Sequence, residues 1–259
     1  MTILIKKELK SAKWKYVIFF ALLIIMAITI IIQYPFVKNL LEQGILEGMP
    51  QWMVKGASQQ TDFNVYLSSN WFDKNLLQLS VIFSILLGMS VIATEVEDHT
   101  IEFLLTRPFS RERIFFEKTG IQLATGLIIM ILTTFILGII SLFQGYEVDL
   151  IRLFIGIIPL FAKFFIIYSL ALLVSLFFDD QVKAGISTGV ILFLLWGINF
   201  IWDLAFVNIF SYAPVTPFYL HGIFPWSAIL KLYLLAFVLY SLSLYKFKNK
   251  DLLWKNILV

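Results

Sequence analysis

The chain has no cysteine, and its 259 residues include only two histidines, His99 and His221. Without thiols it forms no disulfide, no thiolate metal site and no cysteine nucleophile. The two histidines are far apart and have no carboxylates at ligand spacing, so we expect no metal site.

Charge is also scarce. Charged residues make up 14% of the chain and apolar or aromatic residues 60%, with a mean hydropathy of +0.89. A soluble domain is about 45–50% apolar and about 25% charged. So few charged side chains do not cover the surface of a soluble enzyme of this size, and the composition predicts an integral membrane protein.

Common catalytic motifs are missing as well. The sequence contains no GxxxxGK[ST] phosphate loop, no HExxH zinc motif and no GxSxG nucleophile turn. We therefore expect no catalytic residues and no ATP site in this chain. An intramembrane enzyme is disfavoured for the same reason, because no nucleophile–base pair or metal cluster is found.

Long apolar runs fill most of the sequence. A bilayer core of about 30 Å requires about 20 residues of helix, and six runs reach that length: 16–34, 76–94, 120–143, 150–178, 183–206 and 227–245. The first is too long for the core of a signal peptide and counts as a span. The prediction is an all-α membrane protein with one transmembrane domain over 1–259, an outer loop at 38–75 and a cytoplasmic loop at 95–119.

The distribution of Lys and Arg predicts the orientation. Fourteen of these residues fall on the side of the termini and of the loops after spans two and four, against four on the other side. Cytoplasmic segments carry the excess of Lys and Arg. Both termini are therefore expected in the cytoplasm.

The amino-terminal segment has the pattern of a short amphipathic helix. One face carries apolar residues and another carries lysines, as follows: Ile5, Leu9, Ala12 and Tyr16 against Lys6, Lys10 and Lys13. Such a helix lies on the inner membrane surface. The alternative is a positively charged anchor without defined structure.

Lys163 lies about 12 residues into the fourth run, whereas Lys231 and Asp203 lie near span ends. A charge at the bilayer centre costs at least about 2–3 kcal/mol. Lys163 therefore lines a transport path, pairs with another subunit, or reaches the interface through helix tilt. The spans contain no acid near the midplane, which argues against an ion-coupled carrier.

Gly185 and Gly189 form a GxxxG pair in the fifth span, with Gly197 two turns further. Small residues at this spacing let helix backbones approach closely in lipid. The pair predicts close helix contact, either within the chain or between subunits.

The loop after the second span is longer than a simple connection and has a helical pattern. Its apolar residues are Ile101, Leu104 and Leu105, and its acids are Glu97, Asp98 and Glu102, with Pro108 following. Acids early in a helix complement its dipole, and proline ends the helix. We expect a short amphipathic helix that presents apolar and acidic side chains to a protein partner. Contact with lipid is the alternative, although acids are repelled by anionic headgroups.

This loop resembles that of permease subunits of type-2 ABC exporters, the class of bacitracin and lantibiotic resistance and of sodium extrusion. The matching residues, in order, are Glu95 or Glu97, Thr100, Ile101, Glu102, Leu104, Leu105, Pro108, Ser110 and Arg111. His99 stands where the family usually has Gly. The basic segment 6–10 is similar to the family's elbow helix, and 247–252 is similar to its carboxyl-terminal ending.

The resemblance implies a half-transporter. Two permeases, identical or related, would pair, and each would bind a separate cytoplasmic ABC ATPase that holds ATP and Mg. The coupling helix would include Glu97, His99, Thr100, Ile101, Glu102, Phe103, Leu104, Leu105 and Arg107. Spans one, two and five would line the dimer interface and the path, consistent with Gly185 and Gly189.

The family also implies the location and the cargo. The expected location is a bacterial cell membrane, and no nucleic acid is expected as a partner. The segment 212–226 is aromatic, broken by prolines and free of Lys and Arg, and it matches the position of re-entrant helices in the family. It suits an amphipathic substrate, such as an antimicrobial peptide, drug or lipid-like molecule; an ion is the other candidate. The alternative function is a membrane interaction or immunity protein without transport activity.

Overall fold

The computed structural model describes residues 3–43, 58–97, 110–202 and 208–249, and these residues are helical with no strand. Six of the helical stretches are long and apolar enough to cross a membrane. They are Lys13–Glu42, Phe63–Glu95, Arg111–Phe143, Leu150–Ser175, Gln181–Asn199 and Trp226–Asn249. The all-α, six-span prediction is confirmed.

The first stretch is the single helix α2 (Lys13–Glu42), which the short helix α1 (Ile3–Ser11) precedes, whereas the second is built from several helices. The second stretch begins with α4 (Phe63–Asn70), continues through a π-helical turn (Trp71–Asn75) into α5 (Leu76–Ser90), and ends with α6 (Ala93–Glu97). A 3-10 turn, Gln59–Thr61, comes before α4.

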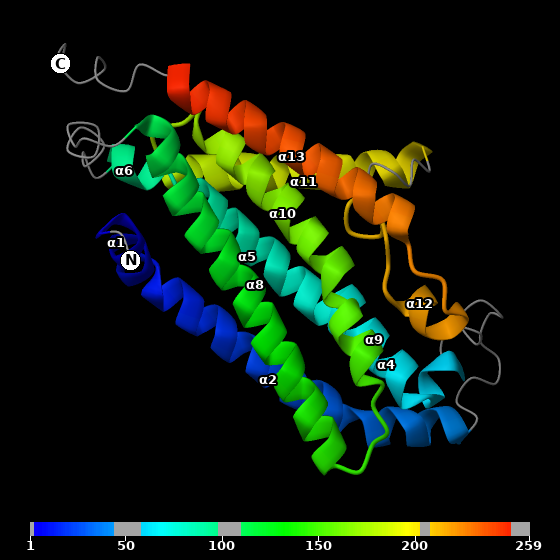
Figure 1. The fold of residues 1–259 in the computed structure, drawn as a ribbon. Helices are drawn as coiled ribbons and strands as arrows, with labels where there is room; N and C mark the ends of the chain where they lie inside the picture. The colour runs from blue at the N-terminus through cyan, green and yellow to red at the C-terminus, as the bar shows by residue number, and fades with distance from the viewer. Residues whose placement is uncertain (1–2, 44–57, 98–109, 203–207, 250–259) are drawn as a thin grey trace.

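The remaining helices complete the bundle. They are α8 (Arg111–Phe143), α9 (Leu150–Ile155), α10 (Ile157–Ser175), α11 (Gln181–Trp202), α12 (Thr216–His221) and α13 (Trp226–Asn249). We call the two ends of the bundle the α6 end, where α1 and the last turn of α13 also lie, and the α12 end, which includes α4 and α9 (Figure 1). The amphipathic pattern of the amino-terminal segment corresponds to α1, whose Lys6 and Lys10 are exposed.

Helix α10 is the centre of the bundle. It packs mainly against α13 and α5. Within the spans, 72% of the fourth is buried but only 17% of the fifth, so α11 lies at the periphery of the chain. At Gly88 of α5 a Cβ atom would lie 2.7 Å from both Tyr168 O and Ala171 Cβ of α10. The two backbones are therefore in direct contact, which only glycine permits.

The second span starts earlier than the sequence predicts. Residues 63–75, assigned to the outer loop 38–75, are helical and largely buried, and α2 extends into that loop as far as Glu42. Polar residues interrupt the apolar run here, but they bond within the protein: Trp71 Nε1 donates to Thr134 Oγ1 at 3.0 Å. At the other end, α8 begins at Arg111, inside the predicted loop 95–119, because Ser110 caps it by accepting a bond from Arg113 N.

Candidate functional site

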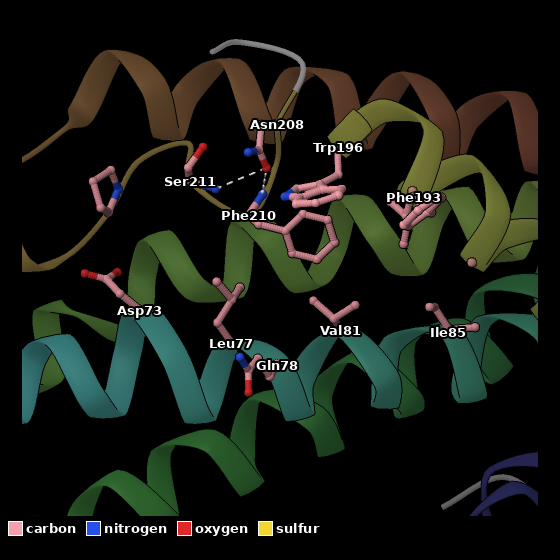
Figure 2. Close-up of a pocket in the computed structure, with 13 residues that line it drawn as sticks. Asp73, Leu77, Gln78, Val81, Ile85, Phe193, Trp196, Asn208, Phe210 and Ser211 are labelled. Atoms are coloured by element: carbon pink, nitrogen blue, oxygen red, sulfur yellow. Dashed lines mark hydrogen bonds between the residues drawn. The ribbon is translucent and has the colours of Figure 1, made fainter. Parts of the chain in front are cut away.

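A cavity of about 920 Å³ lies between α5 and α11, and the segment after α11 closes one side of it (Figure 2). Its lining residues are Asp73, Leu77, Gln78, Val81, Ile85, Gly189, Leu192, Phe193, Trp196, Asn208, Phe210, Ser211 and Pro214. A volume of about 300–1,000 Å³ is typical of small-molecule sites. The cavity therefore has the size to hold one such molecule.

The lining of the cavity is amphipathic. Apolar side chains of α5 and α11, such as Val81, Ile85 and Phe193, face each other along most of its length (Figure 2). Polar groups gather toward the α12 end, where Asp73 and Gln78 lie opposite Asn208 and Ser211. This arrangement suits a ligand with an apolar body and a hydrogen-bonding head.

Asp73 binds the segment that closes the cavity and thereby holds it against the second span. It lies in the π-helical turn, and its carboxylate accepts bonds from Val215 N at 2.8 Å, Thr216 N at 2.9 Å and Thr216 Oγ1 at 2.6 Å. These donors are at the start of α12, which has no side-chain cap of its own in Val215. Asp73 thus caps α12 from another helix.

Lys163 contacts the same segment, although it does not line the cavity. Its side chain is buried, with the residue only 1% exposed, and its ammonium donates to the carbonyl oxygen of Phe210 at 3.3 Å. Lys163 is absent from the residues that line the cavity. The structure therefore places this intramembrane cation against the backbone of the cavity wall, and its role in a transport path stays a prediction.

The two glycines of the GxxxG pair have different surroundings. A Cβ atom on Gly185 would collide with the sulfur of Met89, so Gly185 is in close contact with the second span of the same chain. Gly189 borders the cavity and has no neighbour within 4 Å of the position of a Cβ atom. Subunit contact through these glycines stays a prediction.

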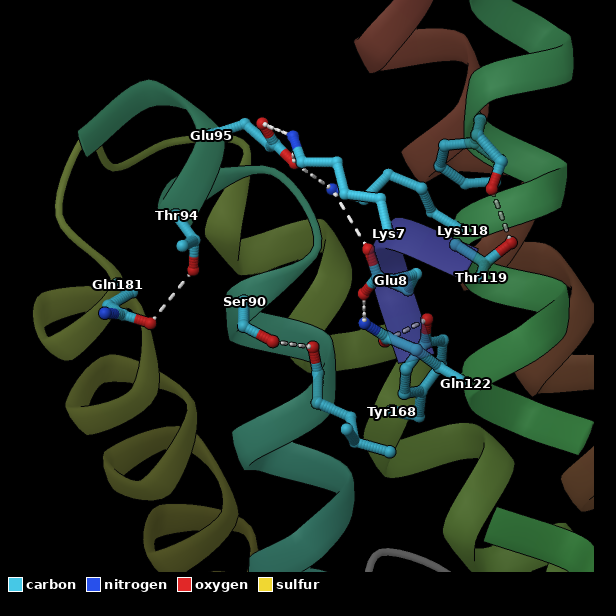
Figure 3. A network of polar contacts seen from close by, with 12 residues as sticks. Lys7, Glu8, Ser90, Thr94, Glu95, Lys118, Thr119, Gln122, Tyr168 and Gln181 are labelled. Carbon is cyan, nitrogen blue, oxygen red and sulfur yellow. Dashed lines mark hydrogen bonds and ion pairs between the residues drawn. The ribbon is translucent and has the colours of Figure 1, made fainter. Parts of the chain in front are cut away.

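At the α6 end, four charged residues form what we call the charged cluster: Lys7, Glu8, Glu95 and Lys118 (Figure 3). The ammonium of Lys118 lies 2.8 Å from Glu95 Oε1 and 3.5 Å from Glu8 Oε2. Lys7 Nζ donates to both oxygens of Glu95 at 3.1 Å. The cluster balances two positive and two negative charges.

The cluster connects four helices. Glu8 comes from α1, Glu95 from α6 and Lys118 from α8, and all three are buried. Gln122 donates to Glu8 Oε1, and the hydroxyl of Tyr168 on α10 donates to Gln122 Oε1 at 3.0 Å. Buried charges are tolerated when they are paired and hydrogen-bonded, as they are here.

The predicted coupling residues lie beside this cluster in the sequence. His99, Thr100, Ile101, Glu102, Phe103, Leu104, Leu105 and Arg107 lie outside the described residues, and Glu97 is the last residue of α6. Glu95 lies just before that stretch and Lys118 shortly after it. The charged cluster therefore joins the two flanks of the predicted coupling loop to each other and to α1.

Sequence reasoning named Glu95 as an acid of the family motif but missed its partners and the polar groups of the cavity. It assigned Asp73 to a loop and used Lys118 only to orient the chain, while Glu8 and Gln122 received no role. An acid and a glutamine within apolar or amphipathic helices were the available signal, because such residues need partners when they are buried.

The fold and site define a multi-pass membrane protein whose spans enclose an amphipathic cavity. The family model for the ABC-2 family transporter protein matches residues 2–215, and the chain belongs to this family. It is a transmembrane permease subunit of an ABC transporter. Comparison with curated proteins and with solved structures finds no match.

Proposed function

We propose that this chain is the permease of an ATP-driven exporter that moves amphipathic molecules through the cell membrane. The observation that carries this proposal is the amphipathic cavity between α5 and α11 in a chain of the ABC-2 family. Its apolar walls and polar end match a substrate with an apolar body and a polar head.

The chain works with partner subunits. It pairs with a second copy or a related permease, and each permease binds one cytoplasmic ABC ATPase. ATP and Mg bind to that ATPase, because this chain has no phosphate loop. The residues 97–107 form the contact with the ATPase.

Both termini lie in the cytoplasm in this proposal, so the α6 end is cytoplasmic and the α12 end faces outward. The Lys and Arg distribution supports this orientation. The charged cluster supports the coupling role, since it fixes both flanks of the coupling loop to α1 and, through Gln122 and Tyr168, to α10. Motion of the loop would then reach the centre of the bundle.

The proposal is tested by purifying the tagged chain in mild detergent from cells that express its native neighbours, followed by mass analysis. We expect an ABC ATPase at one copy per permease. The double substitution Glu102→Ala and Leu105→Ala should release it. The matched pair Glu147→Ala and Leu150→Ala, at the α12 end, should retain it.

A pure permease without any ATPase would contradict the exporter. It would favour the alternative of a membrane interaction or immunity protein.

A further inference from the structure

The segment from Asn208 to Thr216 is the wall that closes the cavity toward the α12 end, and we call it the cavity wall. Four of its residues line the cavity: Asn208, Phe210, Ser211 and Pro214. Its residues up to Val215 lie outside the helices, unlike those of α5 and α11 on the other sides. The shape of the cavity at its polar end therefore depends on what holds this segment in place.

Contacts within the segment order only its first turn. Asn208 Oδ1 accepts bonds from Phe210 N at 3.1 Å and, more weakly, from Ser211 N at 3.4 Å (Figure 2). The fixed position of the segment in the bundle must come from other elements.

Two charged residues, each on a different span, bind the cavity wall, and we call them its anchors. Lys163 of α10 donates to Phe210 O, and Asp73 of the second span accepts three bonds from Val215 and Thr216. Hydrogen bonds to a charged group are stronger than neutral ones. The wall is thus held near each end by a buried or partly buried charge.

Between these anchors the backbone is strained. Ala213 has a φ of 52°, and among the described residues it is the one with a side chain at positive φ. Residues other than glycine adopt this conformation only where the surrounding structure enforces it. The two anchors flank Ala213, which is itself buried, so we expect loss of one anchor to let the wall relax.

We propose that Asp73 and Lys163 are positioning residues that hold the cavity wall closed, and that release of the Asp73 bonds opens the cavity to water at the α12 end. This inference rests on the proposed function in one respect: in an exporter, opening of the cavity at the α12 end would release the substrate. The position of the two anchors does not depend on the partner ATPase.

The absence of cysteine makes a direct test possible. Leu77 lines the cavity and is buried, so Leu77→Cys introduces a single thiol inside it. The rate of its reaction with a membrane-impermeant maleimide, added to one side of vesicles that contain the full chain, measures access to the cavity. Vesicles of both orientations distinguish the two sides.

In the Leu77→Cys background, we expect Asp73→Ala to raise the labelling rate from the α12 side by about ten-fold or more, the change that corresponds to loss of a hydrogen bond to a charged group. Asp73→Asn keeps one acceptor oxygen and should give a smaller increase. Lys163→Met should also accelerate labelling, because it frees Phe210.

Asp180→Ala is the matched control. Asp180 accepts bonds from Val182 N at 2.7 Å and from Lys183 N at 3.2 Å at the start of α11, and it does not line the cavity. Its loss should leave the labelling rate within about two-fold of the parent, as for an independent site. If Asp73 only stabilised the fold, Asp73→Ala would change the labelling rate by no more than this control does.

Size-exclusion chromatography of each variant shows whether it folds, and Asp73→Asn remains informative where Asp73→Ala does not fold. An unchanged labelling rate in folded Asp73→Asn and Lys163→Met would overturn the inference. Acceleration of labelling, together with a co-purification that recovers no ATPase, would support the inference and contradict the proposed function. Acceleration only from the opposite side of the vesicle would support the anchors and overturn the proposed orientation.

Discussion

Lys118 donates to Glu95 Oε1 at 2.8 Å although 23 positions separate the two residues in the sequence. Those intervening positions include the whole predicted coupling helix, 97–107, so this pair closes the loop at its base. Lys118 also lies 3.5 Å from Glu8 Oε2 of α1. One buried cation therefore pairs with two carboxylates that come from two other helices, and Lys7 supplies the second positive charge.

Lys118→Met should strongly destabilise the protein. The substitution removes the ammonium that pairs with Glu8 and one of the cations beside Glu95, and an uncompensated buried charge costs about 3–5 kcal/mol. Unfolding of the purified chain in detergent measures the change in the free energy of unfolding. Lys183→Met is the control, because the exposed Lys183–Asp180 pair at 4.0 Å contributes about 0–1 kcal/mol. Equal stability of the two variants would contradict a structural role for the charged cluster.

Glu102→Lys should uncouple ATP hydrolysis from transport without unfolding the spans. This prediction rests on the family resemblance, in which Glu102 belongs to the coupling helix and faces a basic surface of the ATPase. Reversal of its charge would weaken that contact. ATP hydrolysis and transport are measured on the reconstituted complex. Glu147→Lys makes the same charge change at the α12 end and should leave both activities unchanged; normal transport in Glu102→Lys would refute the assignment.

Ile85→Trp should fill the cavity. Ile85 lines it, whereas Ile82, one turn away on α5, is 56% exposed and lies outside it. Ile82→Trp is thus a substitution of the same size on the outer face of the same helix. We expect Ile85→Trp to abolish stimulation of ATP hydrolysis by an amphipathic probe, with a lantibiotic and rhodamine 6G each assayed, while Ile82→Trp keeps it. The same stimulation in both variants would show that the substrate binds elsewhere.

Gly88→Ala should destabilise the bundle at the contact of α5 with α10. Its Cβ would lie 2.7 Å from Tyr168 O, and backbone atoms do not yield as a flexible side chain does. Overpacking of this kind costs about 1–3 kcal/mol. Gly120→Ala in α8 is the control, because nothing lies within 4 Å of its Cβ position, and it should be neutral or slightly stabilising. Thermal unfolding in detergent compares the two variants.

The number of spans follows from the sequence because a bilayer requires long apolar helices, and such runs are visible without knowledge of tertiary contacts. The start of the second span does not follow from it. Asn70 and Asp73 interrupt the apolar pattern, and only the fold reveals that they bond internally, to Tyr66 O and to the start of α12.

The candidate sites depend still more on tertiary contacts. The partners Lys7 and Glu95 are 88 positions apart, and Asp73 and Thr216 are 143 positions apart. Periodicity describes the faces of single helices and does not pair residues across such distances. The sequence therefore marked Lys163 as unusual, but it did not indicate that its partner is the backbone oxygen of Phe210.

The central position of α10 and the peripheral position of α11 imply unequal tolerance to mutation. Most side chains of α10 are buried, and the helix packs mainly against α13 and α5, so a change of shape at one position disturbs its neighbours. Many side chains of α11 are exposed on the chain, where other apolar residues are acceptable, whereas Ala184, Thr188 and Leu192 are buried and Gly185 lies against Met89. The fifth span can thus accumulate substitutions and alter the lining of the cavity, while α10 preserves the bundle in which that lining is held.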